Sequence, residues 1–108
     1  MKHITPNELA EKLKIGQEVV LLDVRTPQEY DEMHLKNAML LPLQQLSEES
    51  LEARGLGNSV REKEIVIYCR SGGRSLAACS YMSQLGYTNV KNLTGGLMRW
   101  KDKELVEI

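Results

Sequence analysis

Short apolar runs rich in β-branched residues recur along the chain and alternate with segments of helical spacing. A continuous run such as 19–24 is typical of a strand buried on both faces of a sheet. We therefore predict strands at 19–24, 38–41, 64–68 and 89–93, with a short edge strand at 3–4.

Helix-start signals stand between these strands. Thr5-Pro6-Asn7-Glu8 and Thr26-Pro27-Gln28-Glu29 each offer an N-cap threonine, a proline at the first helical position and a glutamate three residues after the cap. The predicted helical segments are 5–14, 26–33, one or two turns within 43–54, 74–85, and a terminal helix from Gly95-Gly96 to about Lys103 whose apolar side is Leu97 and Trp100.

Strands that alternate with helices predict an α/β fold, in which a mostly parallel sheet carries helices on both faces. In such sheets, ligands bind at the carboxyl ends of the strands. The length of 108 residues suits one domain over 1–108.

Composition narrows the function classes. The net charge of −1 predicts no strong attraction to nucleic acid or to an anionic membrane. No segment approaches the roughly 20 apolar residues of a membrane span, and the N-terminus lacks a signal-peptide core. We expect a cytoplasmic, reducing location. The two cysteines lack metal-ligand spacing, so we expect no metal. We also expect no organic cofactor, because the thiol chemistry of Cys69 described below requires none.

The charges are unevenly distributed. Residues 1–64 hold 12 acids and 8 bases, whereas residues 65–108 hold 3 acids and 6 bases. No Asp or Glu occurs between Ile65 and Lys101. This segment favours a thiolate and an anionic substrate if the fold brings its cations together; otherwise it is a run of solvated side chains.

One strand end carries the most distinctive chemistry. The apolar run 65–68 leads into Cys69, and the loop Arg70-Ser71-Gly72-Gly73-Arg74 precedes a predicted helix. Paired glycines allow φ > 0 and turn N–H groups inward, which together with a helix N-terminus makes an anion-binding nest. Cys69 is then a thiolate near neutral pH and a nucleophile. The same residues also fit a buried cysteine beside an ordinary glycine turn.

Other polar side chains have structural interpretations. Arg25 can pair with Asp23 or Glu29 and tie its loop to the sheet. His34 is a candidate general base, although capping a helix end or filling a hydrogen bond suits it better. Cys79 is either a resolving cysteine or, as we favour, a small core residue. Arg74 can bind loop carbonyls or a carboxylate, or face an anion directly.

Several of these segments together resemble the rhodanese family. The resemblance rests on Asp23-Val24-Arg25, Glu29-Tyr30, His34-Leu35 with Ala38, Tyr68 to Ser75, and Gly95-Gly96-Leu97 with Trp100, in family order and spacing. One departure is Met33, where the family usually has glycine.

The resemblance implies a rhodanese-like three-layer fold with a five-stranded sheet, and sulfurtransferase activity. Cys69 would be the catalytic nucleophile that carries a persulfide. The backbone of Arg70, Ser71, Gly72, Gly73 and Arg74 would bind the substrate sulfur, and Arg74 would close the loop. Asp23 and Arg25 would be structural.

The resemblance also bears on the substrates. Cys69 to Arg74 spans six residues, as in the sulfurtransferase branch, whereas related phosphatases and arsenate reductases carry one residue more. The expected partners are a small anionic donor such as thiosulfate, a thiol or cyanide acceptor, and a sulfur-donor protein as a further candidate. The alternative is a sulfur-carrier or partner-docking module with weak small-molecule turnover.

Overall fold

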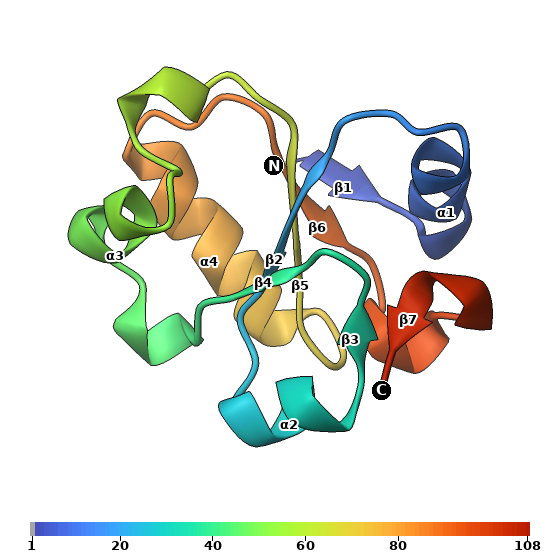
Figure 1. The fold of residues 1–108 in the computed structure, drawn as a ribbon. Helices are drawn as coiled ribbons and strands as arrows, with labels where there is room; N and C mark the ends of the chain where they lie inside the picture. The colour runs from blue at the N-terminus through green and yellow to red at the C-terminus, as the bar shows by residue number, and fades with distance from the viewer. Residues whose placement is uncertain (1) are drawn as a thin grey trace.

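A five-stranded sheet forms the centre of the computed structural model, which describes residues 2–108 (Figure 1). Its strands are β1 (Lys2–Ile4), β2 (Val20–Asp23), β4 (Met39–Leu40), β5 (Ile65–Tyr68) and β6 (Val90–Leu93). They lie in the order β1-β6-β5-β2-β4, and every neighbouring pair is parallel. This confirms the predicted α/β fold with a parallel sheet.

The helices lie in the predicted segments, although the one predicted at 74–85 begins one residue earlier than predicted. They are α1 (Pro6–Lys14), α2 (Pro27–Glu32), α3 (Glu48–Ala53) and α4 (Gly73–Gln84), with 3₁₀ turns at Leu43–Gln45 and Asn58–Val60. Thr5 and Thr26 cap α1 and α2 in complete capping boxes, in which the side chain and backbone of the cap bond to the glutamate three residues later. Local sequence therefore determines these two helix starts.

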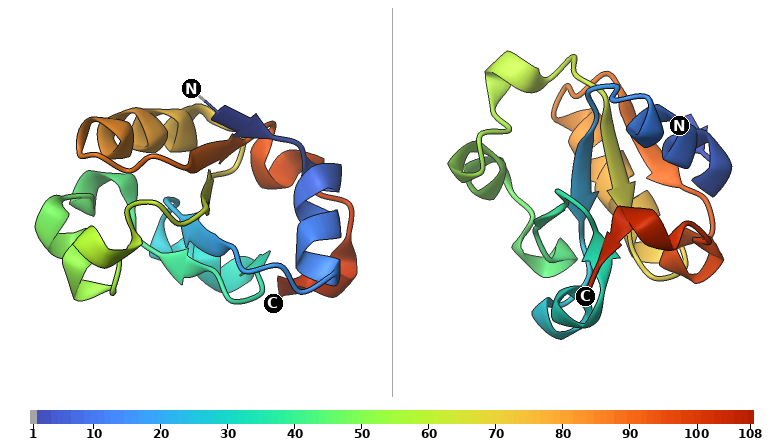
Figure 2. Two further views of the ribbon diagram at one scale, coloured as in Figure 1. Left: turned by 90° about the horizontal axis from the view of Figure 1, so that it is seen from above. Right: turned by 45° about the vertical axis from the view of Figure 1, so that its right-hand side comes forward.

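Successive side chains along each strand point to opposite faces of the sheet, so the core has two parts, one on each face. Leu22 and Ile67 face one side, where they pack with buried residues of α3 and α4. Leu21 and Val66 face the other side, where they pack with Leu9 of α1 and with the C-terminal segment. Figure 2 shows α1 and the α3/α4 pair on opposite sides of the sheet, which gives the three layers.

The predicted terminal helix is wrong. The structure has a 3₁₀ turn at Gly96–Arg99, a second at Lys103–Leu105, and the strand β7 (Val106–Glu107), which pairs antiparallel with β3 (His34–Leu35). Trp100 is extended between the turns, with φ −77° and ψ 128°. The N–H groups that a helix would use internally bond elsewhere, since Leu97 N–H donates to Cys69 O and Met98 N–H to Arg70 O.

None of the helices within residues 2–108 combines the length and apolar character needed to span a membrane.

Candidate active site

Cys69 lies at the carboxyl edge of the central strand. It directly follows β5, and its loop leads into the N-terminus of the twelve-residue helix α4. Gly72 adopts φ 110°, a left-handed conformation that side chains disfavour, and caps α4. Gly73 is the first helical residue and needs no such conformation. Only one glycine of the predicted pair therefore provides the turn.

Hydrogen-bond donors surround the Cys69 sulfur. The N–H of Gly72 lies 3.0 Å from Sγ, and the hydroxyl of Ser75 lies 3.4 Å from it. Burial raises the pKa of the thiol, but Ser75 and the backbone N–H groups of Gly72 and Ser71 outweigh it, so the net pKa lies below its usual value. The loop thus directs backbone N–H groups at the sulfur of Cys69.

A small polar network behind the sulfur was not predicted from the sequence. The Ser75 hydroxyl lies 2.5 Å from Asn92 Oδ1 and 3.2 Å from Gly72 O, and the side chains of Ser75 and Asn92 are buried. Asn92 stands on β6, the neighbour of β5 in the sheet. Asn92 is two residues after Val90 and therefore on the same face of the strand, a signal that could have identified it, because buried polar groups are normally hydrogen-bonded.

Of the predicted alternatives for Arg74, the structure shows binding to a carboxylate. Its two terminal nitrogens lie 2.8 and 3.0 Å from the two oxygens of Glu29 on α2. The Arg74 guanidinium lowers the pKa of Glu29 to about 2, against the opposing effect of burial. Glu29 therefore joins α2 to the Cys69 loop, a role that sequence reasoning did not assign to it.

Two cations of the segment 65–101 pair with acids from elsewhere in the chain. Arg74 binds Glu29, and the ammonium of Lys91 lies 2.5 Å from Glu64, the residue preceding β5 at its amino end. Arg70 remains exposed, and within residues 2–108 its guanidinium makes no ion pair. Acids distant in sequence pair with cations of this segment because the sheet brings them together.

The structural interpretation of Asp23 and Arg25 is correct. Arg25 Nη2 lies 2.7 Å from Asp23 Oδ2 and 2.6 Å from Met33 O, and both charged side chains are buried. Arg25 thus pairs with Asp23 and not with Glu29. Met33 has φ −171°, an extended backbone that any residue adopts, so glycine is not required there.

His34 and Cys79 also have structural environments. The His34 ring stacks on Tyr30 at 3.7 Å between centroids, and its Nδ1 lies 2.8 Å from Tyr30 O. Cys79 lies on the buried face of α4, where burial raises its thiol pKa to about 12. Within residues 2–108 neither side chain is hydrogen-bonded to the Cys69 sulfur, whose partners are Ser75 and Gly72.

Gly96 is a further residue of the site. A Cβ at this position would lie 2.5 Å from both Cys69 O and Arg70 O, so only glycine permits the backbone approach seen here. The backbone of the 3₁₀ turn Gly96–Arg99 therefore lies in direct contact with the backbone of the Cys69 loop. The Gly95-Gly96 pair was visible in the sequence, but its partner in space was not.

A pocket of about 490 Å³ opens beside the loop. It is lined by Arg25, Glu29, Glu32, Met33, Arg70, Leu97 and Met98. A larger hollow of about 770 Å³ lies between α1 and residues 100–104, remote from Cys69. We assign the chemistry to the smaller pocket because it borders the thiol loop at Arg70. Within residues 2–108 no cluster of three or more His, Cys, Asp or Glu is placed to bind a metal ion.

Comparison with known proteins gives consistent matches. The rhodanese-like domain family model matches residues 5–103. A sulfurtransferase of Allochromatium vinosum is 35% identical over 100 residues, covering 93% of this chain and 88% of the relative. The thiosulfate sulfurtransferase GlpE of Coxiella burnetii is 31% identical over 101 residues, covering 94% and 85%. A rhodanese-like domain protein from Staphylococcus aureus superposes with a TM-score of 0.79 at 32% identity, covering 100% and 98%.

These matches extend over nearly the whole chain, and they agree with the resemblance seen in the motifs. The fold places the motif segments at one edge of the sheet, around Cys69. The chain therefore belongs to the rhodanese-like domain family, and its named relatives are sulfurtransferases.

Proposed function

We propose that this protein transfers a sulfane sulfur from thiosulfate or a persulfide donor, through a persulfide on Cys69, to cyanide or a thiol. The observation that carries the proposal is the Cys69 loop itself, in which a buried thiol with a lowered pKa receives the Gly72 N–H at 3.0 Å. Such preorganised donors stabilise sulfur anions without reorganising during the reaction.

In the first step the Cys69 thiolate attacks the outer sulfur of thiosulfate. A new S–S bond forms to Sγ, the bond to the sulfonate sulfur breaks, and sulfite leaves with the electron pair. Cys69 then carries a persulfide anion, whose outer sulfur is held by the N–H groups of the loop 70–74. Arg74, fixed by Glu29, keeps this loop closed.

In the second step the acceptor attacks the outer sulfur. Its lone pair forms the new bond to sulfur, and the S–S electron pair returns to Cys69 as a thiolate. Cyanide leaves as thiocyanate, and a thiolate leaves as a persulfide anion. No external oxidant or reductant is needed, so no redox cofactor takes part in either step.

The loop length supports sulfur over phosphate as the transferred group. The loop from Cys69 to Arg74 has six residues, which is the length of the sulfurtransferase branch and one residue short of the phosphatase branch. Cys69-dependent hydrolysis of a phosphomonoester would contradict this assignment.

The decisive experiment is the intact mass of the protein after incubation with thiosulfate. We expect one added sulfur atom on the wild type and none on Cys69→Ala. Cys79→Ala is the matched control, because it removes the other thiol and should still gain one sulfur. An unmodified wild-type mass, or equal thiocyanate production by wild type and Cys69→Ala, would overturn the proposal.

The sulfur-carrier alternative predicts a different kinetic pattern. A carrier would form the persulfide on Cys69 and then release its sulfur only to a specific protein, with slow turnover on small acceptors. Steady-state thiocyanate production separates the two functions, because an enzyme turns over many times and a carrier completes one transfer.

A further inference from the structure

The pocket beside the Cys69 loop contains four charged side chains and an apolar wall. Two of the four charges are satisfied by the protein itself: Arg25 binds Asp23, and Glu29 binds Arg74. The other two are Arg70 from the loop and Glu32 from the end of α2. Both are exposed, and within residues 2–108 neither forms an ion pair.

A free cation and a free carboxylate in one pocket define a ligand class. A dianion such as thiosulfate would be attracted by Arg70 but repelled by Glu32. A molecule with a carboxylate and an ammonium group can satisfy both side chains at once. The apolar wall of Met33, Leu97 and Met98 offers a surface for the carbon atoms that carry these two groups.

We propose that the natural sulfur acceptor at this site is a small zwitterionic thiol, an α-amino thiol of the cysteine type. Its carboxylate binds Arg70 and its ammonium binds Glu32, while its thiolate faces the persulfide of Cys69. This inference rests on the proposed function, because it assigns the acceptor for the second step of that reaction.

The transfer step balances without another reactant. The acceptor thiolate attacks the outer sulfur of the Cys69 persulfide anion and forms a new S–S bond. The bond between that sulfur and Sγ breaks, and its electron pair stays on Cys69 as a thiolate. The acceptor departs as a persulfide anion, so one sulfur atom has moved and no net oxidation has occurred.

The test uses the full chain, persulfidated with thiosulfate, and four thiols that differ in charge. Cysteine carries both groups, 3-mercaptopropionate only the carboxylate, cysteamine only the ammonium, and 2-mercaptoethanol neither. Single-turnover loss of the added sulfur is followed by mass, with rates compared at equal thiolate concentration. We expect cysteine to react fastest, with each matched charge contributing roughly two- to fivefold, the range of partly exposed ion pairs.

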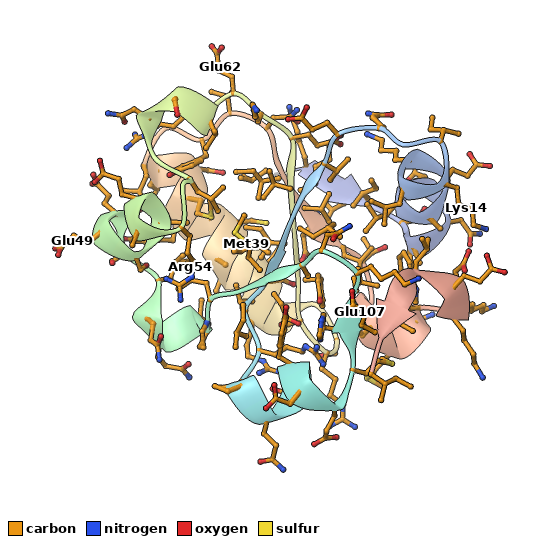
Figure 3. All side chains as sticks on the ribbon, in the orientation of Figure 1. Lys14, Met39, Glu49, Arg54, Glu62 and Glu107 are labelled. Atoms are coloured by element: carbon orange, nitrogen blue, oxygen red, sulfur yellow. The ribbon has the colours of Figure 1, made fainter. Side chains whose placement is uncertain are left out.

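Two variants assign the charges to the two side chains. Glu32→Gln should remove the advantage of cysteine over 3-mercaptopropionate, and Arg70→Gln should remove its advantage over cysteamine. Glu62→Gln is the matched control, because this glutamate lies at the far end of the molecule from α2 (Figure 3). Its rates should follow the wild type.

The outcomes separate this inference from the function on which it rests. If Cys69 gains no sulfur from thiosulfate, the proposed function fails and this inference fails with it. If the persulfide forms but all four thiols react equally, or if Glu32→Gln keeps the wild-type preference, only the zwitterion assignment is overturned. Glu32→Lys gives a second check, because the pocket would then hold two cations and 3-mercaptopropionate should react faster than cysteamine.

Discussion

A comparison of the two cysteines shows, at the scale of single residues, how the Cys69 loop changes the pKa of a buried thiol. Both side chains are almost inaccessible, with exposed fractions of 1% for Cys69 and 0% for Cys79. Burial alone raises the thiol pKa of Cys79 to about 12, whereas the pKa of Cys69 is lowered. Hydrogen-bond donors account for the difference, because they stabilise the charged form that burial disfavours.

The Ser75 hydroxyl, 3.4 Å from Sγ, is the side-chain group in that set, which leads to a prediction. Ser75→Ala should raise the pKa of Cys69, because the thiolate loses the polar neighbour that favours its charged form. We expect the rate of iodoacetamide alkylation near neutral pH to fall roughly tenfold, as one charge-assisted hydrogen bond corresponds to about one pKa unit. The pH dependence of alkylation measures the shift.

Ser71→Ala is the control for this experiment. Its side chain is exposed, and only its backbone N–H acts on the sulfur, so its alkylation profile should match the wild type. Coincident profiles for Ser75→Ala and wild type would show that the hydroxyl does not stabilise the thiolate.

At the scale of elements, the site depends on contacts between segments distant in the chain. Helix α2 holds the Cys69 loop through the Glu29–Arg74 pair, and the 3₁₀ turn Gly96–Arg99 holds it through Leu97 N–H and Met98 N–H. The loop is thus fixed from both sides. Its geometry is a property of three elements and not of the loop alone.

Gly96→Ala tests this support. The added Cβ would lie 2.5 Å from the carbonyl oxygens of Cys69 and Arg70, so the turn or the loop must move. We expect this variant to be less stable than Gly16→Ala by about 1–3 kcal/mol, the usual cost of overpacking. It should also form the Cys69 persulfide more slowly. Denaturant unfolding and the thiosulfate mass assay measure the two effects.

Gly16→Ala isolates the clash from backbone strain. Gly16 has φ 77°, and a Cβ added to it would meet no atom within 4 Å, so alanine there adds left-handed strain without a steric conflict. Persulfide formation should be unchanged in this control. Equal losses of stability in both variants would show that the close approach of Gly96 to the loop is unimportant.

Across the whole molecule, the two edges of the sheet have different roles. Cys69 follows β5 at the carboxyl edge, and Glu64 precedes β5 at the amino edge, about 16 Å away at the strand rise of ~3.3 Å per residue. Glu64 binds Lys12 of α1 at 2.6 Å and Lys91 of β6 at 2.5 Å, with a side chain only 9% exposed. This network joins three elements far from the chemistry.

We therefore predict that Glu64→Gln lowers stability and leaves sulfur transfer intact. Removing the carboxylate leaves two lysines without their partner, which should lower the free energy of unfolding by about 2 kcal/mol at neutral pH. Urea unfolding measures the loss, and the thiosulfate mass assay should give the wild-type rate. A slowed persulfide reaction would show that the two edges are coupled.

The contribution of Glu64 to the free energy of unfolding should depend on pH. Burial opposes ionisation of Glu64, but Lys12 and Lys91 outweigh it, so the pKa is lowered from its ordinary value of 4.5. The stabilising contribution is complete above that value and is lost as the pH falls through the lowered pKa. The stability difference between wild type and Glu64→Gln should therefore shrink in acid.

Local sequence patterns were sufficient for most elements of the fold. At the Thr-Pro starts of α1 and α2, the cap residues bond to glutamates three residues away. The apolar runs of β2 and β5 indicate by themselves that these strands are buried. The predicted terminal helix was wrong because Leu97 and Met98 donate their N–H groups to the Cys69 loop, a partner about 28 residues earlier. The short pairing of β3 with β7 depends on the same long-range placement.

The alternation of strands and helices and the cysteine loop with its glycine pair follow from the amino-acid sequence alone, because each depends on residues close together in the chain. The structure decided that Gly72, and not Gly73, adopts the left-handed conformation. Which charges meet was settled only by the folded arrangement. Folding paired Arg74 with Glu29 and Lys91 with Glu64, joined Ser75 to Asn92, and placed Arg70 and Glu32 in one pocket. Ion pairs and hydrogen bonds act over a few ångströms in space, and the parallel sheet sets those distances between strands that the chain keeps far apart.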